Sequence, residues 1–134
     1  VKDVDFGQGE IIVRDGKGRK DRVTLLPAKL RDPLTEHLQK VRRRHDADIK
    51  KGLGAVELPD ALARKYPRAV FEWGWQWIFA ATRHYTDRAT CLKRRHHLHE
   101  SVIQRAIRDA SAQAHLAKHA SAHALRHTFA THLL

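Results

Sequence analysis

Apolar residues recur at intervals of three or four in three stretches of this chain, which predicts three amphipathic helices. The first follows Pro27, a residue suited to the first turn of a helix, and runs to the glycines at 52–54. The second begins near residue 100, and the third covers 123–134. Their apolar stripes are Leu30, Leu34, Leu38 and Val41; Val102, Ile103, Ala106, Ile107, Ala110 and Ala114; and Leu125, Phe129 and Leu133.

Two runs rich in β-branched residues near the start of the chain predict a β-hairpin. They occupy 10–14 and 22–26, and the segment between them contains two glycines that permit a tight reversal. That segment also carries Lys17 and Lys20, so the tip of the hairpin is basic. On local grounds alone these lysines are typical solubilising turn residues.

The middle of the chain is rich in aromatic residues. A short helix is expected between Pro59 and Pro67, and after it large rings alternate with small or polar residues through 71–79. This alternation predicts an extended strand that buries its rings on one face, Phe79 included. The same rings also suit stacking with an unpaired base, worth about 1 to 3 kcal/mol per base. Residues 84–93 are expected to form a polar loop.

The chain is strongly basic, with 26 Lys and Arg against 15 Asp and Glu and a net charge of +11. This excess predicts a polyanionic partner, most simply nucleic acid, because each neutralised phosphate releases counterions. No apolar run approaches the roughly 20 residues of a membrane-spanning helix. A single cysteine, Cys91, excludes an internal disulfide framework and favours a reducing intracellular setting.

The first predicted helix has a basic side, which favours contact with the DNA backbone over a merely solvated face. The residues expected on this side are Lys40, Arg42, Arg43, Arg44, His45, Lys50 and Lys51. On the second long helix, Arg105 and Arg108 are expected to face solvent or phosphate.

The last predicted helix contains His-Ala-Leu-Arg-His at residues 123–127. Helical spacing puts His123, Arg126 and His127 on one side, as an array of nitrogen donors without an acid that suits a phosphate. The ordinary alternative is a solvated helix face. A zinc-protease pattern would require Glu in place of Ala124, and no cysteine pair supports a structural zinc, so no metal site is expected.

The same segment, continued by Thr-Phe-Ala-Thr-His-Leu-Leu, resembles the box II signature of the tyrosine recombinases, the phage-integrase family of DNA strand exchangers. Ala124 departs from the more usual Thr. In addition, Gly-Lys-Gly-Arg-Lys-Asp-Arg at 16–22 resembles a hairpin of that family's catalytic domain. The resemblance implies an α+β, mainly helical fold like the tyrosine-recombinase catalytic domain, in which a basic β-hairpin packs against helices.

The resemblance also implies phosphodiester exchange through a 3'-phosphotyrosyl intermediate, without a metal or other cofactor. Matched to the family, Arg126 stabilises charge on the phosphate, and His123 hydrogen-bonds that phosphate or assists proton movement. Lys17 protonates the departing 5' oxygen, with Lys20 as the fallback, and His127 supports the site. The implied partners are DNA and further recombinase protomers, which form a tetramer on DNA in the bacterial cytoplasm, associated with the nucleoid.

A second resemblance, to the integron integrases, rests on Ala-Leu-x-Arg-Lys-Tyr-Pro at 61–67, Trp-Gly-Trp-Gln at 73–76 and Arg-Arg-His-His at 94–97. Members of this subgroup act on folded single-stranded hairpin sites and recognise bases that project from the stem. The resemblance makes Trp75, His96 and His97 candidates for stacking on such a base. The predicted DNA-binding residues are Lys20, Arg43, Arg44, Trp75, Arg94, Arg95, His96 and His97.

The family also uses an arginine before the first hairpin, and a Gly-His segment and a nucleophilic tyrosine after box II. Neither Tyr66 nor Tyr85 follows the box. The sequence is therefore predicted to be an internal fragment, a partial catalytic domain over 1–134 that is inactive alone. Its expected parts are the β-hairpin at 7–27, the integron-integrase-like insertion and aromatic segment at 55–80, and the helices with the His-x-x-Arg box at 99–134.

Two alternatives remain at this point. A non-catalytic nucleic-acid-binding module would explain the charge and the tryptophans, but it would make the set of Lys17, His123 and Arg126 accidental. A metal-dependent nuclease or hydrolase would explain the many histidines, and it would require a divalent ion for activity.

Overall fold

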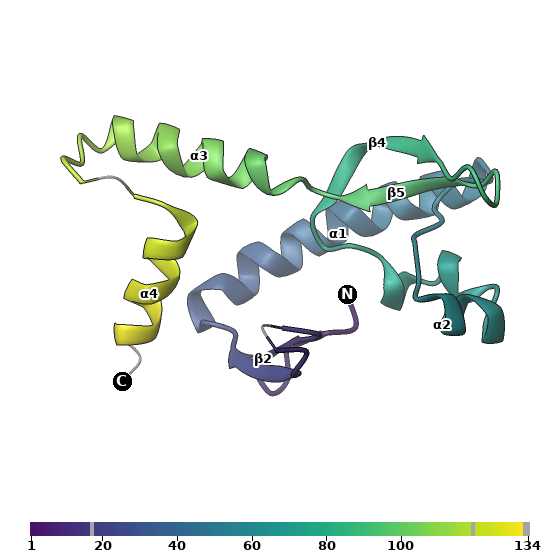
Figure 1. Ribbon diagram of the computed structural model, residues 1–134, viewed down its shortest axis with the longest axis horizontal. Helices are drawn as coiled ribbons and strands as arrows, with labels where there is room; N and C mark the ends of the chain where they lie inside the picture. Colours follow the sequence, from purple (N-terminus) through teal and green to yellow (C-terminus); the bar gives the residue numbers. More distant parts are fainter. Residues whose placement is uncertain (17, 119, 133–134) are drawn as a thin grey trace. The chain divides into compact units, whose positions relative to one another are not determined.

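The computed structural model describes residues 1–16, 18–118 and 120–132, and the chain divides into two compact units, Val1–His97 and Leu98–Leu134. The first unit contains β1 (Val4–Asp5), β2 (Glu10–Val13), β3 (Arg22–Leu25), α1 (Ala28–Lys50), α2 (Asp60–Lys65), β4 (Ala80–Thr86) and β5 (Lys93–His97) (Figure 1). It also has two 3₁₀ turns, Ala69–Phe71 and Trp73–Trp75. The second unit contains α3 (Glu100–Gln113) and α4 (Ala122–His132).

The predicted hairpin is confirmed as β2 and β3, which pair antiparallel with Glu10 opposite Leu25 and Val13 opposite Arg22. Each strand is one residue shorter than expected. A third strand, β1, pairs with the other side of β2, so the sheet order is β1-β2-β3. The sequence did not indicate β1, because a strand of two residues is too short to show alternation.

The long helix α1 is confirmed between Pro27 and the turn in which Gly52 and Gly54 take φ values of +70° and +90°. Residues other than glycine rarely adopt such φ values, so the two glycines allow the backbone to leave the helix here. The prediction that His45 faces outward is wrong, since only 7% of the residue is exposed. It follows buried Val41 by four positions and therefore lies on the same helix face.

This buried histidine makes the stability of the protein depend on pH. Burial lowers the pKa of His45 from its ordinary value of 6.5. Below pH 6.5 the unfolded chain therefore takes up a proton more readily than the native state does, and the free energy of unfolding falls. The loss continues until the pH reaches the lowered native pKa. Above pH 6.5 this contribution is fully present.

We expect urea unfolding of the wild type to lose stability more steeply below pH 6.5 than unfolding of a His45→Gln variant does. The comparison is made on the slope of unfolding free energy against pH, because the variant also changes the absolute stability. Other histidines contribute equally to both proteins. Parallel slopes through the acidic range would show that His45 titrates alike in the folded and unfolded chains.

The predicted strand at 71–79 is wrong. One 3₁₀ turn ends at Phe71 and a second covers Trp73–Trp75, with hydrogen bonds from Trp75 N to the Glu72 carbonyl and from Gln76 N to the Trp73 carbonyl. The buried Gln76 amide fixes this path by donating to the carbonyls of Gly54, Val70 and Glu72 at 3.2 to 3.4 Å. The rings consequently do not share one face. Trp77 and Phe79 are 37% and 55% exposed, so the predicted burial of Phe79 is also wrong.

The predicted polar loop at 84–93 is shorter than expected, because β4 and β5 form an antiparallel hairpin around it. His84 lies opposite Arg95 and Thr86 opposite Lys93. These strands are largely polar and do not alternate, so their pairing left no period in the sequence. The backbone N–H of Arg95 also donates to the Ala55 carbonyl at 2.9 Å, which fastens β5 to the segment that follows α1.

The core of the first unit is small and lies between α2, the 3₁₀ turns and β5. Its buried members are Ala55, Val56, Leu58, Ala69 and Val70, with Ala63, Phe71 and Trp75 packed at the edge. The predicted short helix is confirmed as α2, which begins after Pro59 and ends before Pro67.

In the second unit the two predicted helices are confirmed, but their apolar stripes are not buried. The His99 side chain caps α3 by accepting from the Ser101 N–H, and the Ser121 hydroxyl accepts from the Ala124 N–H at the start of α4. Leu125 and Phe129 are 52% and 42% exposed, and none of the described residues of α3 or α4 is buried. Leu133 lies outside the described residues. Within the described part of the chain, no helix has the length and apolar character needed to cross a bilayer.

Candidate nucleic-acid interface

Helix α4 presents the nitrogen-bearing side chains of the His-x-x-Arg box to solvent. His123, Arg126 and His127 are all exposed, and Ala122–His132 contains no acidic residue. The Nε2 atoms of His123 and His127 lie 2.9 Å apart, so one imidazole donates a hydrogen bond to the other. Their ring planes cross at 81°. Arg126 follows His123 by three positions, which leaves its guanidinium available beside the pair.

A pocket of about 380 Å³ adjoins the box inside the second unit. His123 lines it from α4, and Arg108 and Gln104 line it from α3. Arg108 therefore adds a second guanidinium near His123. The sequence left Arg108 open between solvent and phosphate, because only the packing of α3 and α4 decides which helix positions face each other.

The basic hairpin tip is described only in part. Lys17, the lysine matched to the catalytic one, lies outside the described residues. Lys20 is exposed, and its carbonyl accepts from the Gly16 N–H at 3.2 Å, which closes the turn. Gly18 and Arg19 take φ values of +83° and +57° within this turn. The described part of the turn thus places a lysine and an arginine in solvent.

The basic residues predicted to share one side of α1 have different surroundings. Arg43 is exposed and Arg44 is half-buried, and burial together with the nearby Arg95 charge lowers the pKa of the Arg44 guanidinium. Arg42 pairs with Asp46 at 3.1 Å and lies over the Trp73 ring at 5.1 Å. Of these three, Arg43 is the exposed side chain best placed for a phosphate.

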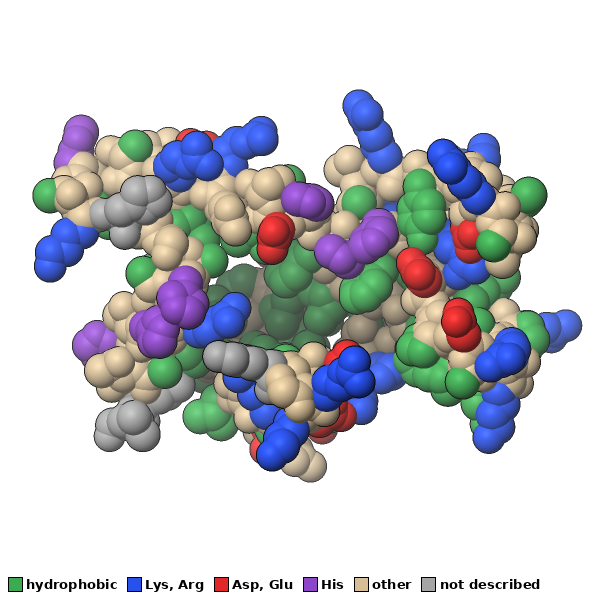
Figure 2. Space-filling view, viewed as in Figure 1, with side chains coloured by type: hydrophobic (Ala, Val, Ile, Leu, Met, Phe, Trp, Pro, Cys, Tyr) green, Lys and Arg blue, Asp and Glu red, His purple; other side chains and the backbone are tan. Residues whose placement is uncertain are grey.

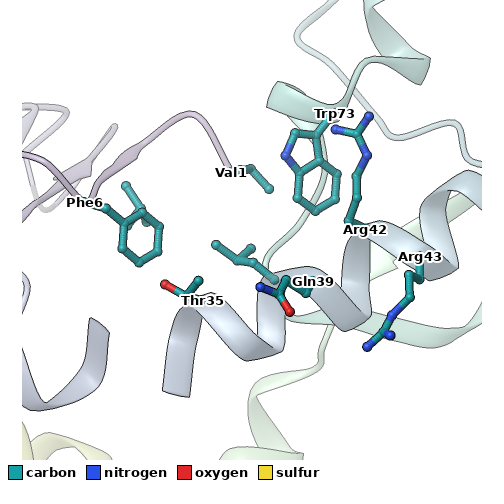
Figure 3. A pocket seen from close by; sticks show the side chains of 9 residues that line it. Val1, Phe6, Thr35, Gln39, Arg42, Arg43 and Trp73 are labelled. Atoms are coloured by element: carbon teal, nitrogen blue, oxygen red, sulfur yellow. The ribbon is translucent and has the colours of Figure 1, made fainter. Parts of the chain in front are cut away.

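An open pocket of about 770 Å³ lies between β1 and α1. Its walls are mainly apolar, and the Arg42 side chain runs beside the Trp73 ring at one end while Arg43 extends away from it (Figure 3). Phe6 stands at the other end, across from Thr35. The charged side chains among its described lining residues, Arg42 and Arg43, both come from α1, so within the described part of the chain this pocket does not bring basic groups from several elements together.

Arg94 and Arg95, predicted to bind DNA, are each only 7% exposed. The Arg95 Nη2 atom lies 2.6 Å from Asp48 Oδ2 on α1, and Nη1 donates to the carbonyls of Ala81 and Thr82 at 2.7 and 2.8 Å. Because every one of these partners belongs to the protein, the burial argues against the predicted DNA contact. Arg95 instead joins α1 to β4.

Arg94 has protein partners as well. Its Nη1 donates to the Val56 carbonyl at 2.9 Å, and its Nε lies 2.9 Å from Asp87 Oδ2. Asp87 begins the turn that links β4 to β5, and Val56 belongs to the buried core. Both consecutive arginines are therefore held by protein partners, and the predicted contact of either with DNA stays a prediction.

The two histidines that follow lie on the surface beside a tryptophan. His96 and His97 are exposed. The Trp77 ring is nearly parallel to the His96 ring, with 6.4 Å between the ring centroids, and edge-on to the His97 ring, with 5.3 Å between the centroids. Tyr85 approaches His96 at 5.9 Å. We call Trp77, Tyr85, His96 and His97 the aromatic cluster.

Trp75, the tryptophan predicted to hold a base with the histidines, has a different environment. It is partly buried against the core, and the Lys2 ammonium lies 4.4 Å from its ring centroid. The sequence analysis selected Trp75 through the integron-integrase resemblance, which matches Trp-Gly-Trp-Gln at 73–76, and did not single out Trp77. No local signal singles out Trp77, because its place beside His96 and His97 depends on the pairing of β4 with β5, which the sequence did not reveal.

Lys and Arg side chains project from the surface of each unit, with fewer acidic side chains among them on the visible face (Figure 2). This agrees with the net charge of +11 and keeps a polyanion as the simplest partner.

Comparisons with known proteins gave matches along the whole length of this chain. The Phage integrase family model matches residues 1–134. The chain is 49% identical over 134 residues to an integrase/recombinase of Escherichia coli and, to the same extent, to an integrase/recombinase of Pseudomonas aeruginosa. All of this chain is covered, but only 40% of each relative. The chain thus spans two fifths of the length of the curated relatives it matches.

Proposed function

Because the chain belongs to the phage integrase family, we propose that it supplies part of the DNA-cleaving domain of a site-specific recombinase. The observation that carries this proposal is the exposed box on α4, where Arg126 and His123 are free of any acidic residue on the same helix. A phosphate approaching α4 would meet a guanidinium and an imidazole together, as charge stabilisation on a phosphodiester requires.

In the proposed reaction a tyrosine of the parent protein attacks the scissile phosphorus. A phosphorus–oxygen bond to the tyrosine forms, the bond to the 5' oxygen breaks, and that oxygen takes up a proton from Lys17. Arg126 balances the negative charge that builds on the nonbridging oxygens. His123 donates a hydrogen bond to one of them or, when neutral, accepts the phenolic proton that the tyrosine loses. Attack by a 5' hydroxyl of the partner strand then reverses the step, so no cofactor is consumed.

His127 supports the site in this scheme by hydrogen-bonding His123. Arg108, which shares the pocket with His123, is a further candidate for phosphate contact. Exposed Lys20 and Arg43 would bind the DNA backbone. The proposed partners are DNA and other protomers in a tetramer, in the bacterial cytoplasm at the nucleoid. That the 134 residues alone are inactive stays a prediction.

We further propose that the parent protein is an integron integrase that acts on folded single-stranded hairpin sites. The support is the short helix α2 between Pro59 and Pro67 and the aromatic cluster, in which Trp77 precedes β4 and the other members lie on β4 and β5. Exposed rings that already lie in contact suit stacking on a base that projects from a stem. That Trp75 stacks on such a base stays a prediction. Its ring is partly buried against the core and lies under the Lys2 ammonium.

The proposed function is tested with a chimera in which this chain replaces the matched 40% of the Escherichia coli relative. We expect the chimera to cleave and rejoin DNA in the presence of a chelator, because the scheme contains no metal. A chimera that folds and binds DNA but never forms a covalent protein–DNA link would favour the non-catalytic binding module. Activity that is lost with a chelator would favour a metal-dependent nuclease.

The aromatic cluster gives a specific prediction for binding. Trp77→Ala is expected to weaken binding of the 134-residue chain to a DNA hairpin with unpaired bases by about 5- to 150-fold, the equivalent of about 1 to 3 kcal/mol of stacking. Binding to a plain duplex should change little. Fluorescence anisotropy with the two DNAs at one salt concentration measures the difference.

Phe79→Ala is the matched control, because Phe79 is an exposed ring of the same segment and stacks on His37 of α1. It should leave hairpin preference unchanged. A Trp75→Ala variant, measured in the same assay, shows whether Trp75 or Trp77 stacks on the unpaired bases. Equal losses on hairpin and duplex would show that Trp77 does not read unpaired bases.

A further inference from the structure

We propose that His123 and His127 form a two-ligand site that reversibly binds a transition-metal ion such as Zn²⁺, Ni²⁺ or Cu²⁺. The two imidazoles are exposed one helical turn apart on α4, and their Nε2 atoms converge to 2.9 Å. Neutral imidazole nitrogen is a preferred ligand of these ions, whereas Mg²⁺ prefers oxygen. The inference rests on this geometry and not on the proposed function.

The distance between the two nitrogens fits a shared ion. Zinc–nitrogen bonds are about 2.0 to 2.1 Å long, and two such bonds that meet at about 90 to 110° hold their nitrogens about 2.9 to 3.4 Å apart. The observed 2.9 Å lies at the near end of this range. An ion can therefore replace the hydrogen bond between the rings after rotation of two exposed side chains, without movement of the helix backbone.

The surroundings limit how tightly an ion is held. Among the residues that the structure describes, no group of three or more His, Cys, Asp or Glu side chains is arranged to hold a metal. The positive charge of neighbouring Arg126 opposes a cation. The remaining coordination positions are left to water or to a small anion. Binding should consequently be weak enough for a chelator to reverse, and it should weaken in acid because both ligands must be deprotonated.

This site differs from the zinc-protease pattern that the sequence argues against. That pattern needs a glutamate at position 124 as a catalytic base, and Ala124 removes it. The absent glutamate is not a ligand, so its loss leaves the two coordinating nitrogens intact. What the geometry supplies is a binding site without a hydrolytic group.

The test titrates Zn²⁺ into the 134-residue chain by calorimetry and follows helix content by circular dichroism. We expect binding with a gain in helicity, because an ion held across one turn favours the folded helix. His127→Ala should weaken this binding about tenfold or more and abolish the gain in helicity. His123→Ala should do the same. Mg²⁺ should give neither signal.

A spacing variant controls for the other histidines. His127→Ala combined with Ala124→His keeps the histidine count but moves the second imidazole to the position next to His123, off the shared face and not four positions from any other histidine, so it should behave like His127→Ala. His132→Ala removes a histidine of the same helix that lies outside the pair, and it should bind as the wild type does. Zinc affinity and helicity gain that are unchanged in His123→Ala and His127→Ala, or retained by the spacing variant, would overturn the proposal.

Discussion

Replacing Arg126 with alanine in the chimeric recombinase is expected to slow DNA cleavage by about 100- to 1000-fold, the cost of losing one preorganised donor at a developing oxyanion. The guanidinium is exposed on α4 and has two parallel N–H groups that fit a phosphate. Because charge on the phosphate rises as the tyrosine attacks, the loss should appear in the cleavage rate. Single-turnover formation of the covalent protein–DNA product measures it.

Binding separates this role from simple charge attraction. Arg126→Ala should reduce affinity for DNA no more than Arg105→Ala, which removes an exposed arginine of α3 outside the box. Arg126→Lys should recover binding but little of the cleavage rate, since an ammonium lacks the planar pair of donors. If Arg126→Ala weakens binding and leaves the rate of the bound complex intact, the residue is a DNA contact and the box is not catalytic.

Replacing Asp48 with alanine is expected to lower the free energy of unfolding of the chain by about 3 to 5 kcal/mol, the usual cost of leaving one partner of a buried ion pair uncompensated. The Asp48 and Arg95 side chains are only 12% and 9% exposed, and their closest atoms lie 2.6 Å apart. His84 also approaches the same carboxylate at 3.4 Å. Urea unfolding followed by tryptophan fluorescence measures the loss.

Asp46→Ala is the matched control, because Asp46 lies on the same helix and pairs with Arg42 in the solvent. It should cost about 0 to 1 kcal/mol, as exposed ion pairs do. A double variant, Asp48→Leu with Arg95→Met, should be less destabilised than Asp48→Ala, since it leaves no unpaired charge. Equal effects of Asp48→Ala and Asp46→Ala would show that the buried pair does not hold α1 to the β4–β5 hairpin.

Charge alone cannot tell these arginines apart in the sequence. Arg43, Arg94 and Arg95 all occur in basic runs, and each was predicted to bind DNA. In the folded unit Arg43 is exposed, whereas Arg94 and Arg95 are buried against Val56 and Asp48. An arginine is useful in both places because its fixed set of donors can satisfy backbone carbonyls as readily as phosphates. Burial, which depends on contacts between distant segments, decides between the two uses.

The aromatic segment shows the same limit. Alternating rings predict a strand, but the Gln76 amide donates hydrogen bonds to three backbone carbonyls and so stabilises 3₁₀ turns instead of a strand. One of those carbonyls belongs to Gly54, which lies 22 positions earlier. A local pattern therefore could not predict the turns, nor that Trp77 would lie beside His96 and His97.

By itself the sequence determined the elements whose cause is local. The 3.6-residue period predicted α3, α4 and, together with Pro27, α1. The flanking Pro59 and Pro67 predicted α2, and β-branched runs about a glycine-containing turn predicted β2 and β3. The family resemblance carried by the His-x-x-Arg box was also visible without coordinates, and the family match confirms it. Only tertiary structure decided which basic and aromatic side chains are covered, because burial and polar pairing are settled by contacts between residues far apart in the chain.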